Sequence, residues 1–167
     1  LEAVRLVCRE TGCAQRYLGG DGLAAVYQAT YQLDADLGSA YHPRLLDYLR
    51  QVHTHDLTLA LAMTDAKGDR SLRPHAQPNQ DAYLRIVGRE AKGIRISGVK
   101  AIVTGAPYAH ELLVLPGRAL TEADRDFALC CAVPVDAPGL TIVARPAGRP
   151  GEAAALFSAK YGQSTGV

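Results

Sequence analysis

The chain has 167 residues, of which 48% are hydrophobic and 21% are charged, and its formal net charge is +1. This composition is typical of a globular protein, and the length suits one domain or a small helical part joined to a β part. The balanced charge, without a block of Lys or Arg, argues against nucleic acid or anionic lipid as a partner. Because no apolar run approaches the roughly 18 residues of a membrane span and no signal-peptide pattern opens the chain, we expect a cytoplasmic location and no membrane.

The four cysteines do not have the spacing of a metal site or of a disulfide framework. Cys8 and Cys13 are five residues apart, which on a helix separates their side chains by roughly 140°. Cys130 and Cys131 are adjacent in a predicted strand, so their side chains would point to opposite faces. We therefore expect no metal and interpret all four as reduced thiols that pack as small apolar groups.

The N-terminal part of the chain is predicted to contain three helices. An apolar pattern over residues 4–18 ends at Gly19 and Gly20, which we expect to break the first helix. The second helix would end at Gly38, and the third is expected over residues 43–52, where leucines and a valine form one apolar face.

From about residue 56 the pattern changes to short apolar or β-branched segments bounded by turn residues, which predicts strands. These segments are residues 57–63, 83–87, 93–104, 112–115, 127–133 and 140–144. Within residues 93–104 the alternation changes parity at Gly98, as expected for a β-bulge or a sharp bend. Helices followed by strands favour an α+β fold, with a helical segment over residues 1–55 and a small antiparallel β-barrel or sandwich over residues 56–167.

Four motifs follow one another along the β part. Residues 62–70 read AMTDAKGDR, residues 98–106 read GVKAIVTGA, residues 134–140 read PVDAPGL and residues 160–163 read KYGQ. This ordered set resembles the β-domain of the acyl-CoA dehydrogenase superfamily. A more specific sequence signature, DAKGDR followed by TGA, resembles the branch that holds 4-hydroxyphenylacetate 3-hydroxylase and 4-hydroxybutyryl-CoA dehydratase. The resemblance covers nearly the whole chain.

The resemblance implies FAD as the cofactor. Strand N–H groups and a Thr hydroxyl suit the flavin ring, and cations of the adjoining turn suit its pyrophosphate. The implied cofactor-binding residues are Met63, Thr64, Lys67, Gly68, Asp69, Arg70 and Thr104. The alternative is that Thr64 and Thr104 only fill a pleated sheet and that residues 67–70 form a solvated turn. No catalytic residue is assigned.

The leading hypothesis is a segment of a flavin-dependent, two-component monooxygenase in aromatic compound catabolism. It would hydroxylate a phenolic or other small aromatic substrate with reduced FAD from a separate flavin reductase. The second hypothesis is a dehydratase acting on a CoA thioester, whose branch holds an iron–sulfur cluster through a Cys-x-x-x-Cys pair. Here residues 13–17 read CAQRY, so Tyr17 replaces the second cysteine, and a phenol is a poor substitute for a thiolate. The third is an inactive, cofactor-cradling subunit or fragment that needs a partner chain.

The resemblance implies a C-terminal helical bundle, which we expect to be missing from these residues, and we expect the β-domain to be incomplete at its C-terminal end. A homo-oligomer or a complementary chain would then cover its open sheet edge and apolar surface. The histidines carry less information. His53 and His55 do not share a helical face, and we interpret His75 and His110 as surface residues, although either could approach a cofactor.

Overall fold

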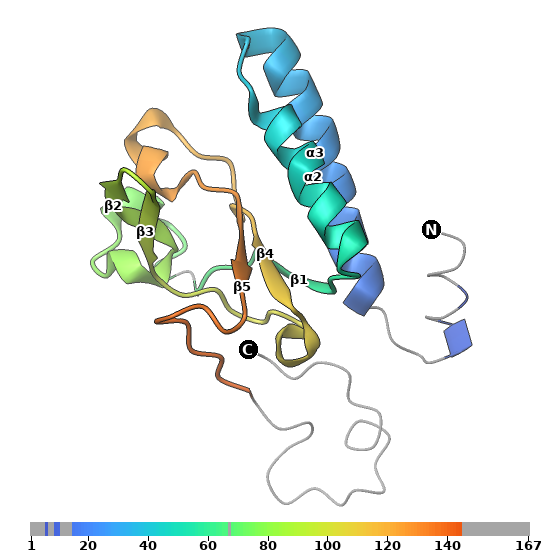
Figure 1. Cartoon of the computed structure of the whole chain (residues 1–167). Helices are drawn as coiled ribbons and strands as arrows, with labels where there is room; N and C mark the ends of the chain where they lie inside the picture. The colour runs from blue at the N-terminus through green and yellow to red at the C-terminus, as the bar shows by residue number, and fades with distance from the viewer. Residues whose placement is uncertain (1–5, 7–8, 11–14, 67, 145–167) are drawn as a thin grey trace, which may run out of the picture.

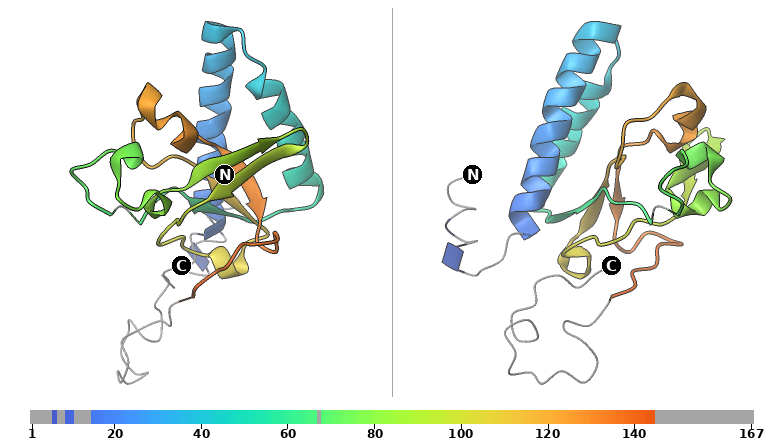
Figure 2. Two further views of the ribbon diagram at one scale, coloured as in Figure 1. Left: turned by 90° about the vertical axis from the view of Figure 1, so that its left-hand side faces the viewer. Right: turned by 180° about the vertical axis from the view of Figure 1, so that it is seen from behind.

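The computed structural model describes the chain apart from residues 1–5, 7–8, 11–14, 67 and 145–167 (Figure 1). Two long helices, α2 (Gln15–Leu37) and α3 (Tyr41–Thr54), form a hairpin that stands beside the β part (Figure 2). This order confirms the predicted α+β layout and the predicted third helix, on which Leu45 and Val52 are buried. No helix among these residues is long and apolar enough to cross a lipid bilayer.

Helix α2 continues through Gly19 and Gly20, so the prediction that this pair breaks a helix is wrong. The reason is the approach of the helix to the first strand. A Cβ atom at Gly19 would lie 2.5 Å from the carbonyl oxygen of Leu59, and one at Gly22 would lie 2.9 Å from Cδ2 of Leu113. Gly19 and Gly22 therefore allow α2 to pack closely on the sheet. Most of the predicted helix over residues 4–18 lies outside the described residues.

The turn between the two helices is organised by Asp34. Gly38 ends α2 at a φ of 63°, as predicted, and its N–H donates to the Asp34 carbonyl at 2.9 Å. The Asp34 carboxylate accepts hydrogen bonds from the Ser39 hydroxyl and from the N–H groups of Tyr41 and His42 at 2.6, 2.9 and 2.7 Å. Burial opposes ionisation, but these bonds outweigh it and lower the pKa of Asp34. One carboxylate thus caps α3 from the end of α2.

The strands form two small sheets. One has the order β1 (Leu59–Ala62), β4 (Glu111–Val114), β5 (Cys131–Pro134), and the other pairs β2 (Arg85–Glu90) with β3 (Gly93–Ser97). The β2–β3 and β4–β5 pairs are antiparallel, but β1 and β4 are parallel, so the prediction of a purely antiparallel sheet is wrong. Neither sheet closes into a barrel within the part of the chain that the structure describes.

Three of the predicted strands are shorter in the structure or do not form. The strand from Gly93 stops at Ser97, because Gly98 has a φ of 134° and a Cβ atom there would lie 2.2 Å from the Tyr83 carbonyl oxygen. The sharp bend at Gly98 is therefore confirmed, while the strand beyond it is not formed. Of the predicted strand 127–133, Phe127 ends a 3₁₀ segment, residues 128–130 are irregular and only residues 131–133 belong to β5. Residues 140–144 form no strand. Their apolar side chains reflect packing on the core rather than strand pairing.

The core lies between the two sheets. Its buried members are Ala60, Ala62, Val103, Ala106, Leu112, Val114 and Leu129. Side chains of the β2–β3 hairpin and of the segment after β5 pack against this cluster. Helix α2 packs on β1, and the parallel pairing of β1 with β4 brings the carboxyl ends of both strands to the same edge of the sheet.

Candidate functional site

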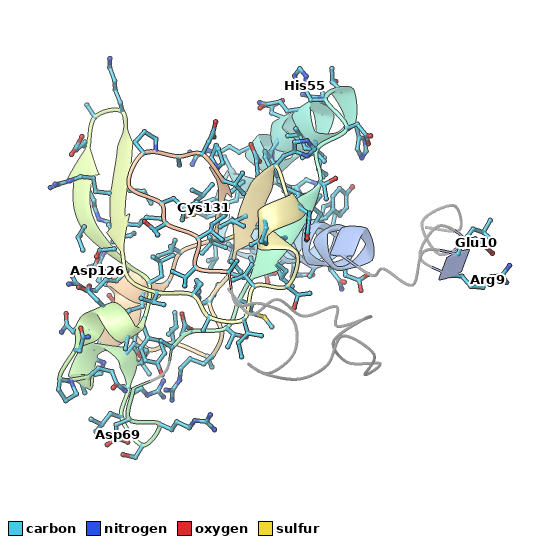
Figure 3. All side chains as sticks on the ribbon, turned by 90° about the horizontal axis from the view of Figure 1, so that it is seen from below. Arg9, Glu10, His55, Asp69, Asp126 and Cys131 are labelled. Carbon is cyan, nitrogen blue, oxygen red and sulfur yellow. The ribbon has the colours of Figure 1, made fainter. Side chains whose placement is uncertain are left out.

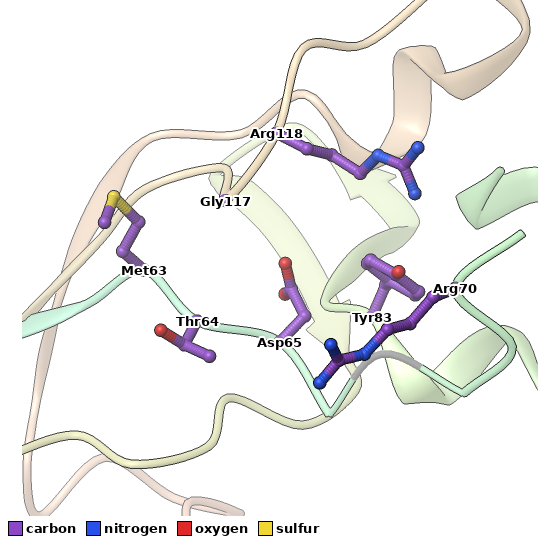
Figure 4. A pocket seen from close by; sticks show the side chains of 7 residues that line it. All are labelled: Met63, Thr64, Asp65, Arg70, Tyr83, Gly117 and Arg118. Carbon is purple, nitrogen blue, oxygen red and sulfur yellow. The ribbon is translucent and has the colours of Figure 1, made fainter.

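A cavity of about 280 Å³ lies at the carboxyl ends of β1 and β4 (Figure 4). Its walls are formed by Met63, Thr64, Asp65, Arg70, Tyr83, Gly117 and Arg118. In the close-up view, Arg70 and Arg118 lie on opposite sides, with Asp65 and Tyr83 between them. The lining thus combines two arginines, a tyrosine and a threonine with one aspartate.

The topology of the sheet explains why these residues meet. Met63, Thr64 and Asp65 directly follow β1, while Gly117 and Arg118 lie three and four residues after the end of β4. Because β1 and β4 are parallel, both chains leave the sheet at the same edge, where side chains from distant segments come together. The Leu115 N–H donates to the Ala62 carbonyl at 3.2 Å and carries the strand pairing to the rim of the cavity.

The charge of the cavity is set by an internal ion pair. Nζ of Lys100 lies 2.6 Å from Oδ1 of Asp65, and the two side chains are only 11% and 7% exposed. This pair is neutral overall, so the unbalanced charges at the cavity are those of Arg70 and Arg118. An anion or a phosphate ester is the ligand that such a site favours.

The turn before Arg70 has its own internal hydrogen bonds. Gly68 has a φ of 40°, and the Gln77 side chain accepts from the Asp69 N–H at 3.0 Å and donates to the Asp69 carbonyl at 2.6 Å. The Asp69 carboxylate accepts from the hydroxyl and N–H of Ser71, which lower its pKa. Figure 3 shows Asp69 at the outer tip of this turn. Gly68 and Asp69 therefore shape the turn that positions Arg70 and do not line the cavity.

The loops that carry the two arginines are tied together. Nη1 of Arg118 donates to the Leu72 carbonyl at 3.2 Å, and Nη1 of Arg73 donates to the Ala119 carbonyl at 3.1 Å. These reciprocal bonds hold the turn after β1 against the segment after β4. They fix the spacing of the two walls of the cavity.

Of the seven expected cofactor-binding residues, Met63, Thr64 and Arg70 line this cavity, whereas Gly68, Asp69 and Thr104 do not. Lys67 lies outside the described residues. Thr104 lies in the turn before the 3₁₀ segment η3 (Ala106–Tyr108) and does not line the cavity. The segment leading to Thr104 is nevertheless joined to the site, because the Ala101 N–H donates to the Thr64 carbonyl at 2.9 Å.

Two residues of the site were not found from the sequence. Tyr83 and Arg118 are far from the first motif, and the only signal for Arg118 is a charged residue in a Pro-Gly turn directly after a predicted strand.

His75 is held by a second polar cluster, away from the cavity. Its Nδ1 lies 2.7 Å from Oδ1 of Asp124, whose side chain is fully buried. The Asp124 carboxylate also accepts from the N–H and hydroxyl of Thr121 at 3.1 and 2.9 Å. Burial would raise the pKa of Asp124, but these hydrogen bonds hold it well below its usual range. The cluster joins the turn after Arg73 to the 3₁₀ segment η4 (Glu122–Phe127).

The remaining candidates are His110 and the cysteines, and the contacts or burial of those that the structure describes indicate a structural role. Nδ1 of His110 accepts the Thr58 N–H at 2.9 Å. Cys130 and Cys131 are free thiols, and burial raises the pKa of Cys131 to about 11, so its neutral thiol form is favoured. Cys8, Cys13 and the Tyr17 side chain lie outside the described residues. No three His, Cys, Asp or Glu side chains converge as a metal site where the structure describes them.

Comparison with known proteins identifies the family. The family model described as "4-hydroxyphenylacetate 3-hydroxylase N terminal" matches residues 1–167. The chain belongs to this family. It is 43% identical over 140 residues to 4-hydroxybutyryl-CoA dehydratase/vinylacetyl-CoA-Δ-isomerase of Clostridium aminobutyricum, a match that covers 83% of the chain and 29% of the relative.

Solved structures show the same likeness. An oxygen-tolerant archaeal 4-hydroxybutyryl-CoA dehydratase from N. maritimus matches with a TM-score of 0.81 and 38% identity, over 89% of this chain and 29% of that one. The oxygenase component of 4-hydroxyphenylacetate 3-monooxygenase, complexed with FAD and 4-hydroxyphenylacetate, matches with a TM-score of 0.60 and 28% identity, over 79% and 27%. The chain thus spans less than a third of the length of these relatives.

Proposed function

We propose that this chain contributes part of the FAD site of a flavin-dependent oxidoreductase. The observation that carries the proposal is the cavity at the ends of β1 and β4, whose lining includes the two cationic side chains Arg70 and Arg118. When bound, FAD supplies the redox chemistry, and the protein binds and orients it and excludes water.

The residues present fit one portion of FAD. Two guanidinium groups suit the pyrophosphate, which they can bind in bidentate fashion. The Thr64 hydroxyl can donate to a phosphate, ribose or ring oxygen atom. A cavity of about 280 Å³ accommodates only a part of so large a cofactor, so other segments of the natural polypeptide would supply the remaining contacts.

For the reaction itself, we propose hydroxylation of a phenolic or other small aromatic substrate, with reduced FAD delivered by a flavin reductase. The structural match to an oxygenase component that binds FAD and 4-hydroxyphenylacetate supports this activity. Tyr17, which stands where the dehydratase pattern has its second cluster cysteine, supports it further.

A second candidate is a dehydratase that acts on a CoA thioester with FAD. It is favoured by the higher identity and the higher TM-score of the dehydratase structure, 38% and 0.81, against 28% and 0.60 for the FAD-bound oxygenase. Tyr17 is the residue that counts against it. In either case the chain would work together with the rest of its polypeptide, a partner chain or further copies of itself.

The test is a visible spectrum, an iron and sulfide determination and two activity assays on the full natural polypeptide. We expect flavin bands without stoichiometric iron, and hydroxylation of 4-hydroxyphenylacetate when a flavin reductase and NADH are added. An iron–sulfur absorption together with dehydration of 4-hydroxybutyryl-CoA would establish the second candidate instead. Absence of FAD binding would overturn both and leave a subunit without a cofactor.

A further inference from the structure

Lys100 makes an unusual set of contacts for a lysine. Its ammonium group donates to the carbonyl oxygens of Met63 and Leu115 at 3.1 and 2.9 Å, and it lies 2.6 Å from Oδ1 of Asp65. An ammonium group has three N–H donors, and these three acceptors can use all of them. The side chain is 11% exposed, so the charge is held inside the fold rather than in solvent.

The three acceptors belong to the two walls of the cavity. Met63 and Asp65 are on the wall that follows β1, and Leu115 begins the wall that follows β4. The same walls approach each other so closely that a Cβ atom at Gly117 would lie 2.7 Å from the Met63 carbonyl oxygen. Lys100 therefore stabilises a close backbone approach in which two carbonyl groups need a common donor.

Lys100 also determines whether the Asp65 carboxylate acts on a ligand. Asp65 lines the cavity, and a Cβ atom at Gly117 would lie 3.0 Å from its second carboxylate oxygen. Without the ammonium, this wall would present an uncompensated negative charge beside the two arginines. A buried charge without its partner is strongly unfavourable, and it would repel a bound phosphate group.

We propose that Lys100 is a positioning residue of the cofactor site: it fixes the two walls and cancels the charge of Asp65, so that the cavity accepts an anion. This inference rests on the proposed function, because the anion is taken to be the pyrophosphate of FAD. Lys100 does not itself line this cavity, so its effect is transmitted through Met63, Asp65 and Leu115.

The experiment compares Lys100→Met, Asp65→Asn and the double variant in the full natural polypeptide. Lys92→Met serves as control, since Lys92 is exposed in the turn between β2 and β3. The dissociation constants of FAD and of inorganic pyrophosphate are measured beside the melting temperature. We expect Lys100→Met to weaken both ligands at least roughly tenfold, because one unscreened charge now acts on the bound anion. Lys92→Met should leave both constants unchanged.

The Asp65→Asn variant removes the negative charge of Asp65 but keeps an acceptor for the Lys100 ammonium group. The amide oxygen still accepts from Lys100, but the ammonium is no longer neutralised, so both ligands should bind as tightly as in the wild type or more tightly. The double variant should bind better than Lys100→Met alone. Equal losses of ligand affinity in Lys100→Met and Asp65→Asn would mean that the contact is purely structural and would overturn the inference. Wild-type affinity in Lys100→Met would also overturn it. If Lys100→Met does not fold, weaker binding in Asp65→Asn still overturns the inference.

The ligands of the wild-type protein separate this inference from the proposed function. If the wild type binds pyrophosphate but no FAD, and the variants change pyrophosphate binding in the way described, only the proposed function is refuted. If the wild type binds neither ligand, the inference and the proposed function are both refuted.

Discussion

The phenol of Tyr48 on α3 donates a hydrogen bond of 2.5 Å to Oε2 of Glu111, the first residue of β4. This contact joins the helical hairpin to the strand that leads to the cavity. Tyr48 is only partly accessible, and burial, followed by the hydrogen bond and charge of Glu111, raises the pKa of the phenol above its ordinary value.

Tyr48→Phe removes the phenol and leaves the carboxylate of Glu111 without this donor. We expect the free energy of unfolding to fall by about 1–3 kcal/mol. The folded state holds the phenol proton more tightly than the unfolded chain does, so the contribution of the pair is present below about pH 10 and is lost as the pH rises toward the raised folded-state pKa. Urea denaturation at increasing pH should therefore show a shallower alkaline decline in the variant. Tyr108→Phe, at a side chain that is 76% exposed, should reproduce the wild-type curve.

The adjacent glycines of α2 give a second prediction, in which each is the control of the other. Gly19→Ala places a methyl group 2.5 Å from the Leu59 carbonyl oxygen and should destabilise the fold by about 1–3 kcal/mol. Gly20→Ala meets no atom within 4 Å and should stabilise it by up to about 1 kcal/mol, because alanine favours the helix. Thermal denaturation should move the two midpoints in opposite directions. Equal shifts would mean that α2 does not pack on β1 as described.

These glycines also show how far the sequence can predict the fold. Helix α3, the glycine that ends α2 and the bend at Gly98 depend on local periodicity and backbone conformation, which a sequence displays. Gly19 does not act through its own backbone preference, but through Leu59, which lies forty residues further along the chain. Likewise, the parallel pairing of β1 with β4 depends on contacts between distant residues, and no turn motif reports it.

The residues of the candidate site fall into the same two groups, those that a local motif indicates and those that depend on contacts between distant residues. Met63, Thr64 and Arg70 fall in one continuous motif, so the resemblance could nominate them, whereas Arg118 reaches the cavity only because the strands are parallel. The partners of Lys100 are mainly backbone carbonyl groups, which have no signature in the sequence.

The Asp124 cluster predicts a specific dependence on acid. Its carboxylate is fully buried and accepts from His75 and Thr121, so Asp124→Asn should destabilise the fold by about 2–3 kcal/mol at neutral pH. Because the folded-state pKa is depressed, this contribution is present above the unfolded value of about 4 and is lost as the pH falls toward the folded value. The variant should therefore lose less stability on acidification.

Asp126→Asn is the matched control for that measurement. Asp126 belongs to the same 3₁₀ segment, is 55% exposed and pairs with Arg89 at 3.2 Å on the surface. Exposed pairs of this kind contribute about 0–1 kcal/mol, so the acid profile should stay close to that of the wild type. If Asp126→Asn flattens the acid profile as much as Asp124→Asn does, the buried cluster is not its source.

The last prediction concerns Arg118, which the sequence did not nominate. Its guanidinium is held at the cavity by the bond to the Leu72 carbonyl, so Arg118→Met removes both a cation and a tie between the walls. If the cavity binds the pyrophosphate of FAD, the loss of charge-assisted hydrogen bonds should weaken FAD by about 1.5–3 kcal/mol in a fluorescence titration. Arg118→Lys should recover only part of this, because an ammonium cannot bind a phosphate in bidentate fashion. Arg95→Met, on the exposed β2–β3 hairpin, should bind FAD normally. Wild-type affinity in Arg118→Met would place the cofactor elsewhere, since no electrostatic contribution from this wall would then remain.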